Sequence, residues 1–410
     1  MPDDRLKVAF LGHVDHGKST LIGRLLYDTG SVPPDRLEEL RAASVERGFD
    51  TEFAFLLDQL VEERDHAMTM DTAQHFFRAG ACEYVAIDAP GHRDLLRNML
   101  TGAWEAQAAV LVVDAQQGLG EQTRRHAFLL TLLGIAHCLL AVNKMDAVGF
   151  EAGPFDALRA DAQAFLARVG VAPAAVVPIS AQRGDNVAVP SSRMPWYHGP
   201  TLLEALDTVP RVREAELPMR FCVQDVYRFD GRRYVAGRVE SGTLRAGDRV
   251  LLLPERVETE VLTIERFLSD RAAAEAGESI AVTLPDGLAV RRGQVLCAPE
   301  RPPRLATWLT ARLFWLAPRP LERGARLTLR VTTQEMPCRI TTIERRTDSS
   351  SLDILEEQAH ELAAAEVAEV SLETPTPLTV EPARDSPALG RLILESDAQL
   401  VGAGLVVEAR

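Results

Sequence analysis

The segment Gly12–Thr20, with the sequence GHVDHGKST, constrains the fold of this chain more than any other feature. It follows an apolar run, Lys7–Leu11, and precedes a stretch with helical periodicity, which is the context that the pattern G-x-x-x-x-G-K-[ST] requires. Its glycines allow the backbone to curl so that successive N–H groups point inward, and the start of the helix adds positive potential. A chance match in a glycine-containing turn is the alternative. The flanking strand and helix favour a loop that binds the phosphates of a nucleoside triphosphate.

Every residue of this phosphate loop is a candidate for nucleotide contact. Lys18 is expected to reach the β- and γ-phosphates and to assist catalysis there, and the Ser19 hydroxyl is expected to be a ligand of Mg²⁺. The candidate nucleotide-binding residues of the loop are Gly12, His13, Val14, Asp15, His16, Gly17, Lys18, Ser19 and Thr20.

Up to about Pro210, short apolar runs alternate with helical stretches. Near-continuous apolar strands between helices are typical of a parallel sheet that is covered on both faces. We therefore predict that residues 1–212 form an α/β domain with a doubly wound, mostly parallel sheet. The expected strands include Lys7–Leu11, Tyr84–Ile87, Ala109–Val113, Cys138–Val142 and Ala175–Ile179.

After Pro210 the runs become shorter, and apolar residues alternate with polar ones, as in Val235–Val239 and Leu327–Val331. Asp-Gly and Gly-Asp pairs between such runs are turn signals of antiparallel strands. We therefore predict two antiparallel β-barrel domains, at 213–302 and 303–410, with the proline-rich stretch 299–303 as a linker between them.

Polar residues follow the predicted strands of the α/β domain at the points where each strand ends. Asp88 and Gly91 come after the run Tyr84–Ile87. Asp88 can hold Mg²⁺ through water, and Gly91, which has no Cβ, allows its N–H to approach a γ-phosphate. Pro90, between them, is a further candidate contact.

Two later clusters indicate which base is bound. Asn143-Lys144-Met145-Asp146 follows the run Cys138–Val142, and the Asp146 carboxylate can accept both hydrogen bonds that guanine N1–H and its 2-amino group donate. Ser180 and Ala181 follow the next run, where backbone N–H groups could bind guanine O6. Ligands of doubly wound sheets bind at this edge. A helix-capping role for Asp146 is the alternative. The base-side candidates are Asn143, Lys144, Asp146, Ser180 and Ala181, so we predict a P-loop GTPase domain with GTP and Mg²⁺ as cofactors.

A long segment separates the phosphate loop from Asp88, and we expect two helices in it, around 34–47 and 53–63. Thr69, in preference to Thr72, is expected to be a second hydroxyl ligand of Mg²⁺ and to order this segment only when GTP is bound. His92 is expected to orient the attacking water. The predicted catalytic residues are His92, Lys18, Thr69 and Gly91, and the predicted metal ligands are Ser19, Thr69 and Asp88.

Composition argues against several other functions. The formal net charge of −14 disfavours tight non-specific binding of nucleic acid, which depends on clustered Lys and Arg. Five dispersed cysteines without metal-ligand spacing are typical of reduced thiols in a cytosolic protein. No apolar run approaches the length of a membrane-spanning helix, and the polar N-terminus does not have the pattern of a signal peptide. We therefore expect a cytoplasmic location and no membrane partner.

These motifs, and the order of one α/β domain and two β-domains, resemble the translation-factor superfamily of GTPases, the elongation factor Tu class. Within it, the segments 18–28, 71–77, 97–103 and 195–204 are more similar to the GTPase (large) subunit of the bacterial two-subunit ATP sulfurylase, a sulfate adenylyltransferase. This resemblance implies that GTP hydrolysis drives adenylylsulfate formation from ATP and sulfate, in sulfate assimilation. It also implies a partner, a smaller PP-loop catalytic subunit that transfers the adenylyl group, in a heterodimer or a higher assembly.

Two other functions stay open. An elongation-factor-like GTPase would deliver an RNA to the ribosome and would need a basic or aromatic surface, whereas the arginines between 228 and 245 are interrupted by acidic residues. A divergent GTP-dependent regulatory scaffold, which barely hydrolyses GTP, is suggested by Ala67, because the family usually has a conformationally freer glycine at that position of the switch.

Overall fold

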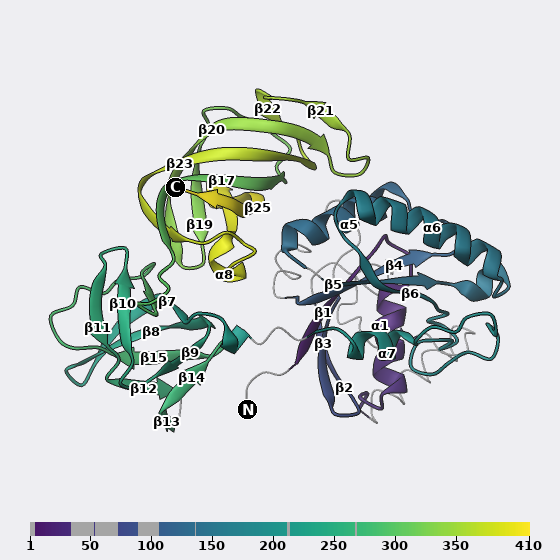
Figure 1. The fold of residues 1–410 in the computed structure, drawn as a ribbon, viewed down its shortest axis with the longest axis horizontal. Helices are drawn as coiled ribbons and strands as arrows, with labels where there is room; N and C mark the ends of the chain where they lie inside the picture. Colours follow the sequence, from purple (N-terminus) through teal and green to yellow (C-terminus); the bar gives the residue numbers. More distant parts are fainter. Residues whose placement is uncertain are drawn as a thin grey trace. The chain divides into compact units, whose positions relative to one another are not determined.

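The computed structural model describes residues 5–33, 53, 73–88, 106–135, 137–210, 214–266 and 269–410 (Figure 1). The chain divides into two compact units. The α/β unit contains Asp4–Arg211 and Ser349–Leu352, and the β unit contains Val212–Asp348 and Asp353–Arg410. Within the described ranges, no helix has both the length and the apolar character needed to cross a membrane.

The sheet of the α/β unit has the strand order β2-β3-β1-β4-β5-β6. The neighbouring pairs from β3 to β6 are parallel, and β2 alone is antiparallel to its neighbour β3. This confirms the predicted mostly parallel sheet. The edge strand β2 was not among the expected strands. The bounds are β1 Leu6–Leu11, β2 Ala73–Ala79, β3 Cys82–Asp88, β4 Ala108–Asp114, β5 His137–Asn143 and β6 Pro173–Pro178.

Helices lie on both faces of this sheet, with α1 and α7 on one face and α5 and α6 on the other (Figure 1). Because strand side chains alternate between the two faces, Val8, Phe10 and Val110 pack against the buried leucines of α1 and α7. The helices of this unit are α1 (Lys18–Asp28), α5 (Glu121–Leu133), α6 (Ala152–Arg168) and α7 (Leu202–Asp207), and a short 3-10 helix, η3, spans Met145–Val148.

Local structure explains the end of α5 and the beginning of α7. α5 ends at Gly134, whose φ of 69° is the left-handed conformation that a glycine adopts without strain. α7 begins with a capping box, in which the Thr201 hydroxyl accepts from the Glu204 N–H and the Glu204 carboxylate accepts from the Thr201 N–H. The part of the segment 195–204 that starts α7 is thereby explained by helix capping.

The first β-domain of the β unit is an open, antiparallel sheet with the order β11-β10-β16-β7-β8-β15-β12-β13. In the part of the chain that the structure describes, its end strands β11 and β13 do not pair with each other, so the sheet is a half-barrel. A short helix, η4 (Glu214–Glu216), precedes it, and β9 and β14 form a separate pair. The strands are β7 Arg220–Phe229, β8 Arg232–Ser241, β9 Thr243–Arg245, β10 Arg249–Leu253, β11 Val257–Glu260, β12 Thr263–Arg266, β13 Ser269–Arg271, β14 Ala273–Glu275, β15 Ser279–Thr283 and β16 Val295–Cys297.

The second β-domain is a closed barrel. Because β19 pairs with both β20 and β24, the strands β19, β24, β25, β17, β23 and β20 form a closed ring around a core that includes Leu329, Ile340 and Leu372. The strands are β17 Arg304–Trp315, β18 Leu321–Glu322, β19 Arg326–Val331, β20 Gln334–Asp348, β21 Ile354–Glu356, β22 Glu361–Leu362, β23 Glu366–Val380, β24 Arg391–Ser396 and β25 Gln399–Ala409, with the short helix α8 at Pro387–Gly390.

An ion pair joins the two β-domains within the β unit. The Arg220 guanidinium, 2% exposed, makes two hydrogen bonds to the Glu381 carboxylate, at 2.8 and 3.1 Å. Cys222, Val295 and Leu389 form a small apolar cluster between the same domains. The prediction of two antiparallel β-domains after the α/β domain is confirmed, and the boundaries 213–302 and 303–410 stay predictions.

Candidate functional site

The phosphate loop joins β1 to α1 and depends on two glycines at close approaches. A Cβ on Gly12 would lie 2.4 Å from the Val112 carbonyl oxygen, and a Cβ on Gly17 would lie 2.5 Å from the Asn143 amide nitrogen. Gly17 also has a φ of 85°, in the left-handed region. Side chains other than hydrogen would therefore open the loop away from β4 and β5.

Lys18 lies at the centre of this loop. Its ammonium group donates to the carbonyl oxygens of Gly12, at 3.0 Å, and of His13, at 2.8 Å. Burial lowers the pKa of Lys18 to about 8, and the negative charges of Asp88 and Asp15 oppose this shift. The loop therefore holds a buried cation around which its backbone is wrapped, as the binding of a polyanion requires.

Ser19 and Asp88, two of the predicted metal ligands, lie in direct contact. The Ser19 hydroxyl donates to Asp88 Oδ2 at 2.8 Å, and Asp88, at the end of β3, is 1% exposed. A hydroxyl and a carboxylate beside a phosphate loop are the hard oxygen donors that Mg²⁺ takes together with phosphate oxygens. The residues present here therefore fit a magnesium ion.

Asn143 connects the phosphate loop with the loop that carries Ser180 and Ala181. Its Nδ2 donates to the His16 carbonyl oxygen at 2.8 Å, and its Oδ1 accepts from the Ala181 N–H at 2.9 Å. Both bonds are buried. The sequence identified Asn143 as a nucleotide contact, whereas the structure shows that its amide is a link between two loops.

Asp146 lies in the first turn of η3, and its carboxylate accepts from the Ser180 hydroxyl at 2.6 Å. Lys144 directly precedes η3, with a φ of 61°, and its ammonium lies 2.9 Å from Asp114 Oδ2. The base-side candidates from β5 and β6 therefore come together at the same edge of the sheet as the phosphate loop. No motif in the sequence pointed to Asp114.

The other residues of the phosphate loop differ in exposure. His16 is buried, its Nδ1 lies 3.2 Å from the Val112 carbonyl oxygen, and burial lowers the pKa of its imidazole. The His13 ring lies beside it, with 5.4 Å between the ring centroids. Asp15 is exposed, Val14 and Thr20 are partly exposed, and Thr20 belongs to the first turn of α1.

Four predicted site residues lie outside the described residues: Thr69, Pro90, Gly91 and His92. The same holds for the helix expected around 34–47 and, except for Phe53, for the helix expected around 53–63. Their predicted roles in metal binding, switching and water activation stay predictions.

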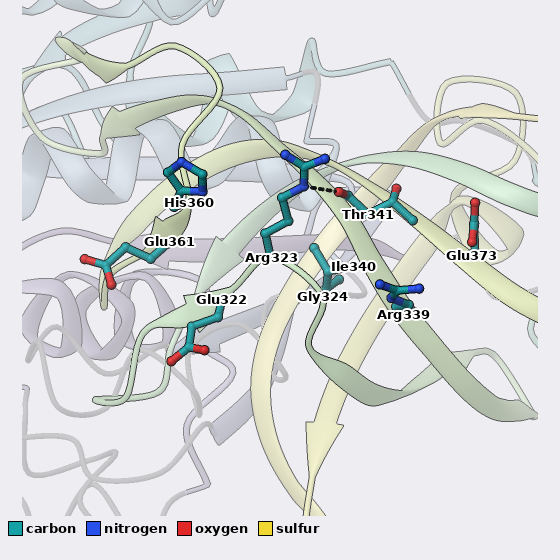
Figure 2. A pocket seen from close by; sticks show the side chains of 9 residues that line it. All are labelled: Glu322, Arg323, Gly324, Arg339, Ile340, Thr341, His360, Glu361 and Glu373. Atoms are coloured by element: carbon teal, nitrogen blue, oxygen red, sulfur yellow. Dashed lines mark hydrogen bonds between the residues drawn. The ribbon is translucent and has the colours of Figure 1, made fainter.

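A concave region with a volume of about 780 Å³ lies on the closed barrel (Figure 2). In Figure 2, His360 and Glu361 lie at one end of the labelled group, Arg339 and Glu373 at the other, and Arg323 between them. Arg323 donates to the Thr341 carbonyl oxygen at 2.8 Å. The lining of the region includes both carboxylates and cationic side chains. Its lining residues are Glu322, Arg323, Gly324, Arg339, Ile340, Thr341, His360, Glu361 and Glu373.

Comparison with known proteins covers most of the chain. Three family models match it: elongation factor Tu GTP binding domain at residues 3–211, elongation factor Tu domain 2 at 232–297, and GTP-eEF1A C-terminal domain-like at 308–407. The elongation factor 1-alpha of Archaeoglobus fulgidus is 39% identical over 99% of this chain and 98% of its own length. The elongation factor 1-alpha of Methanocaldococcus jannaschii is 38% identical over 99% of this chain and 97% of its own length.

Proposed function

The chain belongs to the translation-factor GTPases of the elongation factor Tu and elongation factor 1-alpha family, and on that premise we propose that it is an elongation-factor-like GTPase that delivers an RNA to the ribosome. The observation that supports GTP binding and hydrolysis most directly is the convergence of the phosphate loop, Asp88, Asn143–Asp146 and Ser180–Ala181 at one edge of the sheet. That arrangement provides places for phosphates, a cation and a guanine base within one site. The proposal of RNA delivery draws its support from the similarity to elongation factors over almost the whole chain.

In this proposal each group of site residues has its own role. Lys18 and the loop N–H groups bind the β- and γ-phosphates, and Asp146 selects guanine. Ser19 and Asp88 hold Mg²⁺, together with Thr69, and the ion supplies neutralisation of the charge on the phosphate oxygens. His92 orients water for attack on the γ-phosphate, and the Gly91 N–H binds the γ-phosphate.

Two measurements test the proposal. The purified chain is expected to bind GTP, and programmed ribosomes are expected to stimulate its hydrolysis of GTP. Aminoacylated tRNA, used as the RNA probe, is expected to bind more tightly in the presence of a non-hydrolysable GTP analogue than in the presence of GDP. RNA delivery would be excluded if ribosomes did not change the rate of GTP hydrolysis and if tRNA bound equally tightly in the presence of either nucleotide.

The second candidate is the GTPase subunit of sulfate adenylyltransferase, acting with a smaller PP-loop subunit. The resemblance of the segment 195–204 favours this candidate. However, two features of that segment have structural roles: Thr201 and Glu204 cap α7, and Trp196 donates a hydrogen bond to the Phe150 carbonyl oxygen at 2.8 Å. The relatives named above are elongation factors, so this candidate has less support. GTP-stimulated release of pyrophosphate from ATP and sulfate, by the chain together with such a subunit, would favour it over RNA delivery.

A further inference from the structure

Asp114 is a charged residue at the candidate site that belongs to none of the recognised motifs. It is the last residue of β4 and lies opposite Asn143, the last residue of β5, in the register of the two strands. Its side chain is 2% exposed. Burying a carboxylate costs free energy unless its oxygens are hydrogen-bonded and its charge is paired.

Both oxygens of the Asp114 carboxylate are engaged. Oδ1 accepts from the Gln116 N–H at 2.7 Å, and Oδ2 lies 2.9 Å from the Lys144 ammonium. Burial alone would raise the pKa of the Asp114 carboxyl, but the hydrogen bonds from Lys144 and Gln116 hold this pKa below its usual value. Asp114 is therefore an anion that is well placed to hold the Lys144 side chain.

Lys144 is constrained at both ends. Its backbone has a φ of 61°, which is unfavourable for a residue with a Cβ, and its ammonium is held by Asp114. The side chain between these two points is 35% exposed. A lysine stem fixed in this way presents methylene groups along the sheet edge, to which a flat base can bind.

Asp114 is also close to the phosphate loop. Its negative charge acts on His16, where it raises the pKa of the imidazole against the larger effect of burial. The Ala115 N–H donates to the Asn143 carbonyl oxygen at 2.9 Å, and the Asn143 amide bonds to the His16 carbonyl oxygen. The end of β4 thus lies between the phosphate loop and the base-side residues.

We propose that Asp114 is a positioning residue for nucleotide binding, which holds the Lys144 side chain along the sheet edge so that the guanine base meets a preformed surface. This inference rests on the proposed function, because it requires that the site binds a guanine nucleotide. Since the pair lies on the base side, its effect is the same for GDP and GTP and does not extend to the hydrolytic step.

The test compares the parent chain with Asp114→Asn, Lys144→Met and the double variant. Asp114→Asn keeps the size of the side chain and an acceptor for the Gln116 N–H, and removes the charge that holds Lys144. We expect the Kd values for GDP and GTP to rise by about tenfold, the factor that corresponds to roughly 1.4 kcal/mol. The KM for GTP should rise by the same factor, and kcat should stay within twofold of the parent value.

The double variant separates positioning from a general structural role. If Asp114 acts through Lys144, the Kd of the double variant for GDP lies within twofold of the Kd of Lys144→Met alone. If the two residues act independently, the factors by which the single substitutions raise Kd multiply in the double variant. Asp28→Asn is the matched control, since it neutralises a carboxylate that pairs with Arg24 at 2.8 Å on α1, and it should leave Kd unchanged. If Lys144→Met does not fold, Asp114→Asn alone decides the question. A raised KM with kcat unchanged supports the positioning role, and a lowered kcat contradicts it.

The possible failures are distinguishable. A parent chain that binds no guanine nucleotide refutes the proposed function as well. A parent that binds normally, with Asp114→Asn within twofold of it, or with losses that multiply in the double variant, refutes only the positioning role.

Discussion

The amide of Asn143 offers the most direct test of how the candidate site is organised. Asn143→Ala removes the hydrogen bond to the His16 carbonyl oxygen and the hydrogen bond from the Ala181 N–H. Both groups belong to residues that are 1% exposed, so each would be left buried without its present partner. A buried donor or acceptor that loses its partner costs about 1–3 kcal/mol, and the two together lower the free energy of unfolding by about 2–4 kcal/mol if relaxation recovers part of the loss.

The same substitution should weaken nucleotide binding. Without the amide, the phosphate loop and the loop of Ser180 and Ala181 are free to separate, and a nucleotide has to order them when it binds. Fixing the backbone of one residue costs roughly 1–2 kcal/mol, so ordering even one residue in each loop raises Kd by at least about tenfold. The assays are urea unfolding of the nucleotide-free chain and titration with a fluorescent GDP derivative.

Asn186→Ala is the matched control for this prediction. Asn186 is 3% exposed, donates to the Pro178 carbonyl oxygen at 2.9 Å and accepts from the Ser191 N–H at 2.8 Å. It therefore has the same chemistry as Asn143 in the same unit, but makes no hydrogen bond to the phosphate loop. Both variants should lose stability, and Asn143→Ala should lose much more affinity. Equal changes of Kd in the two variants, or a Kd of Asn143→Ala within twofold of the parent, would refute the reasoning.

Three further predictions concern selectivity, catalysis and pH. Asp146→Asn should shift preference from GTP to XTP, because the exchanged amide offers a donor where the carboxylate accepts; retained GTP selectivity in competition binding would contradict this. His92→Ala should lower kcat for GTP hydrolysis by ~10²–10⁴, with GTP affinity retained, as for other positioned proton-handling groups, and a rate within twofold of the parent would exclude the role. The Lys18 pKa of about 8 implies that the free site loses its cation as pH rises through 8, whereas bound phosphates favour the charged form. GTP affinity should therefore fall above pH 8, and GTP binding should take up as much as one proton. Calorimetry in buffers of different ionisation enthalpy measures this uptake. Lys18→Arg should bind GTP without proton uptake.

The central strands could be predicted because the sheet buries them on both faces. β1, β3, β4, β5 and β6 appear in the sequence as nearly continuous apolar runs, and their observed bounds differ from the predicted ones by no more than two residues. β2 was missed for the opposite reason. It is an edge strand in which only Phe77 is buried, so neither a continuous apolar run nor a clear alternation marks it.

The closure of the second β-domain could not be predicted from local pattern. It depends on the pairing of β19 with β20 and with β24, and alternation within a strand does not say which strands become neighbours. The same limit applies to Asp114. An aspartate at the end of an apolar run matches no motif by itself, and its role depends on Lys144, which reaches it from the neighbouring strand end.

Gly17 and Asn143 show why the motifs of this site are informative together. The phosphate-loop pattern requires Gly17 and the base-side pattern requires Asn143, and the two patterns are connected by a hydrogen bond across 127 residues. A Cβ on residue 17 would lie 2.5 Å from the Asn143 amide nitrogen and would push it off the His16 carbonyl oxygen. The glycine is therefore required by its backbone conformation and, independently, by the amide next to it. Because the Asn143 amide fills the space that Gly17 leaves, replacing either residue would disturb the hydrogen bond that connects the phosphate loop with the base side.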